Sequence, residues 1–268
     1  MRKNAWVICC CTAVLAAFGT FFRWLQDQVC FEAETGLAVR GSIWPYAVAL
    51  MIVIAAVVLA VVCFRMKNQP HTSFPDSLPA AFVAAPRVRT IGGVVLGALL
   101  AVGGAWLMIS SGTLSSPGLQ RVLAALTIVT GAAFIWQMLS IGDGETTSGT
   151  VVCASMPIVL LAFWLIVSYK VNIINPTVSA YAVEILALCA ALIAFYELAG
   201  FAYGRPKAIR SIFWSQFAAF LCITALPDDR TGGQQLMLAA IASMLLFQSY
   251  LTASNIRPAV SGPVGGAQ

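Results

Sequence analysis

A series of long apolar runs restricts this chain to the membrane. Eight runs of about 18 residues or more occur, at 5–22, 43–64, 90–111, 122–141, 151–169, 178–203, 209–226 and 236–253. A helix needs roughly 20 apolar residues to cross the hydrocarbon core, and lipid leaves no unpaired backbone groups, so such runs form helices. The sequence predicts an all-α polytopic integral membrane protein, a bundle of about eight transmembrane helices. They form one domain over 1–254, and 255–268 is predicted to be a flexible tail.

The composition agrees with a chain that lies in lipid. Hydrophobic residues make up 60% and charged residues 9%, whereas soluble domains carry about 25% charged residues. The net charge of +5 does not indicate nucleic acid, because the basic residues lie mostly at the ends of the apolar runs. The expected partner is the lipid bilayer, and nucleic acid is excluded.

The distribution of basic residues predicts the orientation. With eight spans, one side holds the larger group, Arg2, Lys3, Arg65, Lys67, Arg87, Arg89, Arg205, Lys207, Arg210 and Arg257, and the other holds Arg23, Arg40, Arg121, Lys170 and Arg230. The positive-inside rule then places both termini in the cytoplasm, at the cell membrane. Compact loops without large domains are typical of a bacterial protein. In an alternative with seven spans, the weak run 209–226 is re-entrant and the C-terminus lies outside.

Two polar connections separate the first three runs. Residues 23–42 are too polar to span, and are interpreted as a loop or a binding lid. Residues 65–89 contain four prolines, Pro70, Pro75, Pro79 and Pro86, which interrupt any long helix. Within this linker, residues 78–85 are predicted to form a short surface helix.

The run 178–203 carries two glutamates, Glu184 and Glu197. A carboxylate at membrane depth costs about 2.5–3.5 kcal/mol, so each needs a partner. Their spacing places them about 20 Å apart along a helix and about 140° apart around it, which excludes a carboxylate dyad. Glu184 is expected in the outer half with Tyr181, near the basic residues at the outer helix ends, Arg23, Arg121 and Lys170.

Glu197 is expected in the inner half of the membrane, within a layer of amides. Gln137 and Gln248 reach a similar depth in their own runs, and Gln216 lies nearer the middle. Such a layer either fixes helix packing or lines a path. No basic residue is expected to pair with Glu197, because Arg205 is about 12 Å away by helical rise. This isolation ranks Glu197 above Glu184 as the candidate functional residue.

Small residues repeat every four positions in the run 90–111. The stripe begins with Gly93 and Gly97 and continues through Ala101 and Ala105; Gly200 and Gly204 form a shorter version. Stripes of this kind let a neighbouring helix backbone approach closely. These four glycines are therefore predicted to be packing residues.

No catalytic, metal or cofactor site is indicated. The chain has none of the metalloprotease, nucleophile-elbow or P-loop motifs, and its eight cysteines form no CxxC pair. Its one histidine, His71, offers little general base or metal-ligand capacity. Packing is the simplest role for the cysteines, with acylation at Cys9–Cys11 and pairing of Cys30 with Cys222 as alternatives.

Two functions remain open from the sequence. The first is an accessory, sensor or structural membrane subunit that works with other membrane subunits. The second is a small permease or solute carrier whose glutamates bind a cation, a proton or an amine. A water-accessible cavity that reaches Glu197 would favour the carrier, whereas a close-packed bundle would favour the subunit.

Overall fold

Long helices account for most of the described chain. The computed structural model describes residues 2–30, 42–68, 72–82, 86–113, 116–141, 147–173 and 178–258. Seven of its helices are 23 to 28 residues long: α1 (Arg2–Val29), α2 (Trp44–Lys67), α4 (Pro86–Ser110), α5 (Pro117–Ser140), α6 (Ser148–Asn172), α7 (Val178–Ala202) and α9 (Gly232–Ser254). All seven are apolar enough to cross a membrane, and α8 (Ala208–Thr224) is a shorter apolar helix of 17 residues. The all-α membrane bundle is thus confirmed.

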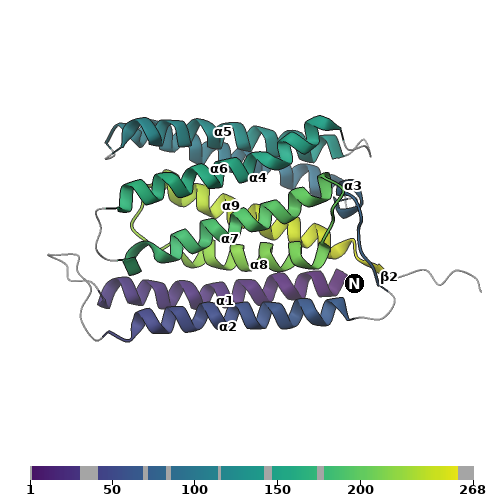
Figure 1. Cartoon of the computed structure of the whole chain (residues 1–268), viewed down its shortest axis with the longest axis horizontal. Coiled ribbons are helices and arrows are strands. Elements are labelled where there is room, and N and C mark those ends of the chain that lie inside the picture. Colours follow the sequence, from purple (N-terminus) through teal and green to yellow (C-terminus); the bar gives the residue numbers. More distant parts are fainter. Residues whose placement is uncertain are drawn as a thin grey trace, which may run out of the picture.

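The helices lie side by side along the long axis of the molecule (Figure 1). Helices α1 and α2 form one edge of the bundle, and α4 and α5 lie toward the other. Between them, α8 packs against α1, α2, α7 and α9, while α9 also packs against α4. The start of α1 and strand β2 lie at the same end of the molecule (Figure 1).

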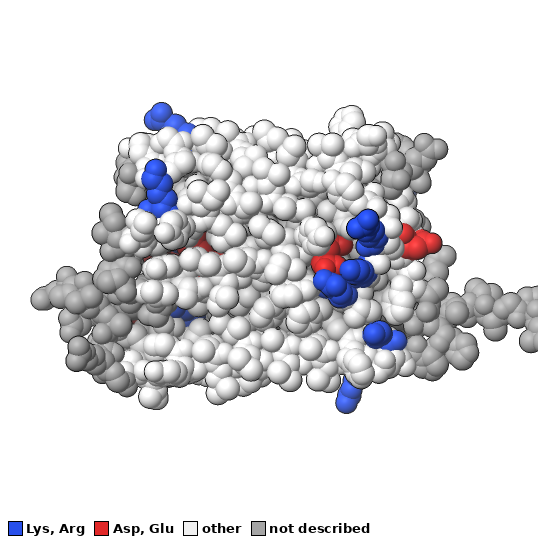
Figure 2. All heavy atoms as spheres, viewed as in Figure 1, with Lys and Arg blue, Asp and Glu red and all other residues white. Residues whose placement is uncertain are grey.

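The two ends of the bundle differ in charge. We call one of them the basic end, because the helix ends there carry most of the basic residues, Arg65, Lys67, Arg87, Arg89, Arg205, Lys207 and Arg210. The opposite end has Arg23, Arg121, Lys170 and Arg230 together with Asp27, Glu184 and Asp228. Figure 2 shows these charges near the two ends and uncharged atoms across the middle. Exposed apolar side chains such as Val57, Val95 and Val129 cover this middle band, which suits contact with lipid.

Short elements close the basic end. Strand β1 (Thr72–Ser73) pairs antiparallel with β2 (Arg257–Pro258). The predicted surface helix is α3 (Leu78–Phe82), but it packs on α7 and α9 and buries Phe82. Asn255 holds it there, because its Nδ2 donates to the Ala81 carbonyl oxygen at 2.7 Å. The segment after residue 254 therefore begins as bound structure, and residues 259–268 of the predicted tail lie outside the described residues.

Helices α4 and α5 approach each other backbone to backbone. A Cβ atom at Gly97 would lie 2.7 Å from the Gly131 carbonyl oxygen, and one at Gly131 would lie 2.6 Å from the Gly97 carbonyl oxygen. Gly93 meets the Met138 side chain in the same interface. A short 3-10 helix, η1 (Ser111–Thr113), follows α4. Gly131, on the partner helix, was not part of the predicted stripe.

The other two predicted packing glycines belong to a helix end. Gly204 has φ +69°, the left-handed conformation that glycine adopts most easily, directly after α7. The Arg205 N–H donates to the Gly200 carbonyl oxygen at 2.8 Å, as in the usual glycine-ended helix terminus. A Cβ at Gly200 would meet Arg205, and one at Gly204 would meet nothing within 4 Å. These two glycines end α7 and turn the chain toward α8.

Helix α8 is short and central. Its 17 residues span about 26 Å, whereas the 25 residues of α7 span about 38 Å. Both helices meet at the basic end, so α8 stops well before its neighbours reach the opposite end. Pro227 helps to prevent its continuation, and Thr231 caps α9 by accepting a hydrogen bond from the Gln234 N–H at 3.4 Å. The turn from 225 to 231 thus lies inside the bundle rather than above it.

Candidate functional site

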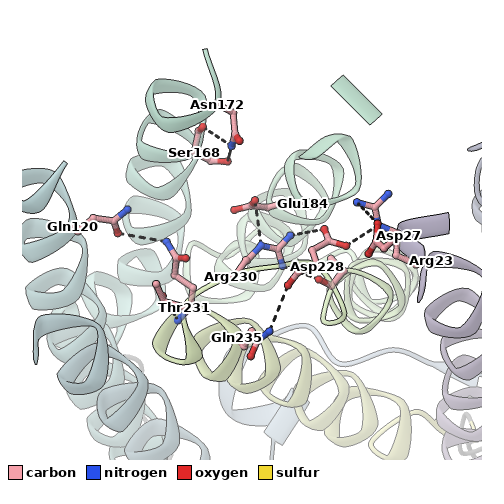
Figure 3. A network of polar contacts seen from close by, with 12 residues as sticks. Arg23, Asp27, Gln120, Ser168, Asn172, Glu184, Asp228, Arg230, Thr231 and Gln235 are labelled. Carbon is pink, nitrogen blue, oxygen red and sulfur yellow. Dashed lines mark hydrogen bonds and ion pairs between the residues drawn. The ribbon is translucent and has the colours of Figure 1, made fainter. Parts of the chain in front are cut away.

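Five charged side chains of alternating sign run through the α8–α9 turn (Figure 3). Glu184 of α7 faces Arg230, Arg230 binds Asp228, Asp228 binds Arg23 of α1, and Arg23 faces Asp27. We call this series the charged chain. Arg23, Asp228 and Glu184 are all buried. The charged chain therefore connects α1 and α7 to the turn between α8 and α9.

Arg230 holds the turn in three directions. Its Nη2 donates to Asp228 Oδ2 at 2.8 Å, and its Nε donates to Glu184 Oε2 at 3.3 Å. Its Nη1 donates to the Ala225 carbonyl oxygen at 2.7 Å, which satisfies a backbone group at the end of α8. A buried guanidinium with this many acceptors is compensated for its desolvation.

Asp228 is shared by the two arginines. Its Oδ1 accepts from Arg23 Nε at 2.7 Å, while Oδ2 accepts from Arg230 as above. Arg23 also donates from Nη1 to Gln26 Oε1 at 3.0 Å. Charge-assisted bonds of this length are stronger than neutral ones. Asp228 is consequently the centre of the charged chain.

A cavity of about 500 Å³ opens beside the charged chain. Helices α1, α5, α6, α7 and α9 all contribute to its wall, with polar side chains that include Gln120, Ser168, Asn172, Tyr181 and Gln234. On one side Gln234 Nε2 lies 3.5 Å from Gln120 Oε1. Apolar surface comes from Trp164, Val167 and Val171. The volume is in the range of about 300–1,000 Å³ that small-molecule pockets occupy.

The cavity wall carries an excess of negative charge. Four carboxylates line it, from Asp27, Glu184, Asp228 and Asp229, against two guanidinium groups, from Arg23 and Arg230. Asp27 is only loosely paired, at 3.8 Å from Arg23 Nη2, and its Oδ2 has no hydrogen-bond partner within the described residues. The net negative charge of the wall favours a cationic guest.

Glu184 and Tyr181 both line this cavity, next to each other on α7. The pairing partner of Glu184 differs from the expected Arg23, Arg121 or Lys170, because it is Arg230. From the sequence, Arg230 was expected among the basic residues of the outer side, with no link to Glu184. The available signal was the shortness of the run 209–226, which forces the following turn to lie at the depth of its neighbours' side chains.

Glu197 has a basic partner, contrary to the expected amide-only environment. Arg210 Nη2 lies 2.5 Å from Glu197 Oε1. Helical rise gives only the distance from Glu197 to Arg205 along a continued axis of α7. The turn at Gly204 instead returns the chain antiparallel, so the first turn of α8 brings Arg210 back to the depth of Glu197.

The predicted amide layer is divided in the structure. Gln137 and Gln248 are buried and line a small void of about 10 Å³, which α7 borders with Phe195, Leu198 and Ala199. Glu197 precedes Leu198 in the sequence but is not part of that wall. Consecutive positions on a helix are rotated by about 100°, so the two side chains point in different directions. Gln216 lies elsewhere and donates to Ser249 Oγ at 2.9 Å. Position along a run gives the depth of a side chain in the membrane, but not the direction in which it points around its helix.

The cysteines make no disulfide. All eight are free, including Cys30 and Cys222, the pair considered from the sequence. Within the described residues, no three His, Cys, Asp or Glu side chains are grouped as a metal site requires.

Compared with known protein families, with curated proteins and with solved structures, the chain matches none. The residues of the charged chain and its cavity are therefore the basis on which a function can be assigned. They are contributed by helices that are far apart in sequence, and they lie at one end of the bundle.

Proposed function

We propose that this multi-pass membrane protein is a sensor or accessory subunit that binds a small organic amine in the cavity at the α8–α9 turn. The observation that carries the proposal is the acidic wall of a cavity of about 500 Å³. An ammonium group would compensate the surplus negative charge of the cavity wall. Trp164 offers an aromatic ring for the alkyl part or for a cation–π contact.

The orientation is part of the proposal. The excess of basic residues at the basic end supports placing that end in the cytoplasm, with both termini. The cavity then opens to the outside of a bacterial cell membrane. A solute could reach it without entering the cell, which suits a sensor or a subunit that responds to external conditions.

Binding without transport is favoured by the interior of the bundle. Beyond Glu184, α7 continues toward the basic end with buried apolar residues, Ala187, Leu188, Ala191, Ala194 and Phe195. The void beside Gln137 and Gln248 holds about 10 Å³, which is no more than a single water needs. A carrier needs a route for its solute past this region, so we rank the carrier second. Its test is a measurement of solute flux across the membrane.

The test uses the full chain in nanodiscs and measures thermal unfolding with a panel of organic amines. We expect at least one amine to raise the unfolding temperature of the wild type, since a ligand stabilises the state that it binds. Asp27→Asn should weaken that response and Glu184→Gln should remove it. Glu197→Gln is the matched control on the same helix and should respond like the wild type.

Two results would contradict the proposal. One is the absence of stabilisation by every amine, and the other is an unchanged response in both Asp27→Asn and Glu184→Gln. Uptake of the stabilising amine into proteoliposomes separates the two candidates. Flux that depends on Glu184 would replace the sensor with a carrier.

A further inference from the structure

A second hollow lies at the basic end, where α7 turns into α8. This groove of about 650 Å³ is bounded by α6, α7 and the first turn of α8. Its charged and aromatic side chains are Tyr196, Glu197, Tyr203, Arg205, Lys207 and Arg210. The charged chain and its cavity are at the other end of the bundle, so the two sites are separate.

The groove is strongly basic. Three cations face one carboxylate, and Glu197 is paired with Arg210 through Nη2 alone. Arg205 and Lys207 are exposed, and neither has an ion pair within the part of the chain that the structure describes. The net charge of the groove is thus about +2, which favours an anion.

The backbone adds to this preference. The turn at Gly204 places residues 205–207 between the end of α7 and the start of α8. Lys207 is the N-cap residue of α8 and makes no side-chain capping bond. The first N–H groups of a helix point outward and carry partial positive charge, so they add donors beside the three cations.

The groove opens toward the lipid-facing side of α7. Tyr196 is 65% exposed and Tyr203 60% exposed. The Tyr203 hydroxyl lies 3.0 Å from Ser155 Oγ, which fixes the ring at the edge of the groove. Val159 of α6 is also exposed. Tyrosines at this level, between basic residues and an apolar surface, are typical of the membrane interface.

We propose that this groove binds the phosphate headgroup of an anionic phospholipid in the leaflet at the basic end. Arg205 and Lys207 contact the phosphate, with the remaining donors of Arg210 and the N-terminus of α8 beside it. The acyl chains lie along the exposed apolar surface of α6 and α7. This surface distinguishes a lipid from a free anion, because a soluble phosphate would gain nothing from it.

Native mass spectrometry of the full chain tests the proposal, with phosphatidylglycerol and phosphatidylcholine of identical acyl chains as probes. The wild type should retain phosphatidylglycerol over phosphatidylcholine. Arg205→Gln with Lys207→Gln should weaken phosphatidylglycerol binding about 25-fold, on the order of fivefold for each cation at a membrane surface. Arg65→Gln with Lys67→Gln is the matched control, since both residues are exposed at the same end on α2.

Several outcomes would overturn the proposal. The wild type could fail to distinguish the two lipids, a comparison that needs no variant. The two double variants could lose phosphatidylglycerol equally, which would indicate general attraction by the basic end. Excess glycerol 1-phosphate could displace the lipid completely, which would indicate a site for a soluble anion. Elution as a single species with unchanged helical circular dichroism shows that each variant is folded.

Discussion

Arg230 and Glu184 lie 46 positions apart in the sequence, and their side chains meet inside the bundle with Nε and Oε2 separated by 3.3 Å (Figure 3). Both side chains are at most 10% exposed. The contact joins α7 to the turn between α8 and α9. Loss of either charge should therefore weaken the packing of the helices at this end of the molecule.

Replacing Arg230 should lower the free energy of unfolding more than replacing any exposed basic residue at the same end of the bundle. Arg230→Gln leaves Asp228 and Glu184 without their full compensation, and removal of one member of a buried pair costs about 3–5 kcal/mol. Unfolding of the purified protein in mixed micelles measures this change. Lys170→Gln, at an exposed site of the same end, should remain within about 0.5 kcal/mol of the wild type. Equal losses in both variants would show that the charged chain does not stabilise the fold.

The two glutamates of α7 should differ in their contribution to stability. Glu184→Ala leaves Arg230 buried with one acceptor fewer, at an expected cost of about 1–3 kcal/mol. Glu197→Ala leaves Arg210, whose side chain is 57% exposed and can be hydrated. Its ion pair should therefore contribute less than about 1 kcal/mol. The same unfolding measurement compares the variants, and a larger loss for Glu197→Ala than for Glu184→Ala would contradict this order.

Two glycines of α5 provide a matched test of close packing. Gly131→Ala places a methyl group 2.6 Å from the Gly97 carbonyl oxygen, so α4 must move away. Such overpacking costs about 1–3 kcal/mol. A methyl group at Gly118 meets nothing within 4 Å, and Gly118→Ala should be neutral or stabilise by about 0.4–1 kcal/mol. Folded yield and unfolding in detergent measure both, and equal tolerance would exclude a close α4–α5 contact.

The proposed orientation can be tested by reporter fusions. A reporter attached at Gln268 should be active in the cytoplasm, and one attached after Thr231 should be active outside. Thr231 precedes α9 at the end opposite the basic end, so this fusion reports the side that α8 reaches. An external signal from the Gln268 fusion would contradict the orientation and favour an odd number of spans.

The sequence alone was sufficient to predict the membrane helices. Apolar length alone predicts the helices, since a run that fills the hydrocarbon core has no other stable structure. Tyr181 and Glu184 were expected at similar depth from their positions along one run. Both line the same cavity.

Partners that depend on a turn could not be predicted in this way. Arg210 reaches Glu197 because Gly204 reverses the chain, and Arg230 reaches Glu184 because α8 stops early. Gln137 and Gln248 line the same small void while Gln216 does not, which depends on the rotation of each helix about its axis. The depth of a residue in the membrane does not give the rotation of its helix. The relative height of two antiparallel helices depends on the packing of the whole bundle.

The early end of α8 also affects the electric field across the membrane. Because α1, α2, α7 and α9 surround α8, its shortness does not require the bilayer to thin around it. The polar cavity lies beside the end of α8. Water that filled it would extend the aqueous phase inward, and the membrane potential would then fall over a shorter distance there. Moving one charge through the whole potential is worth about 2.3 kcal/mol per 100 mV. A cation in this hollow has crossed part of that drop, and its occupancy should therefore change with voltage.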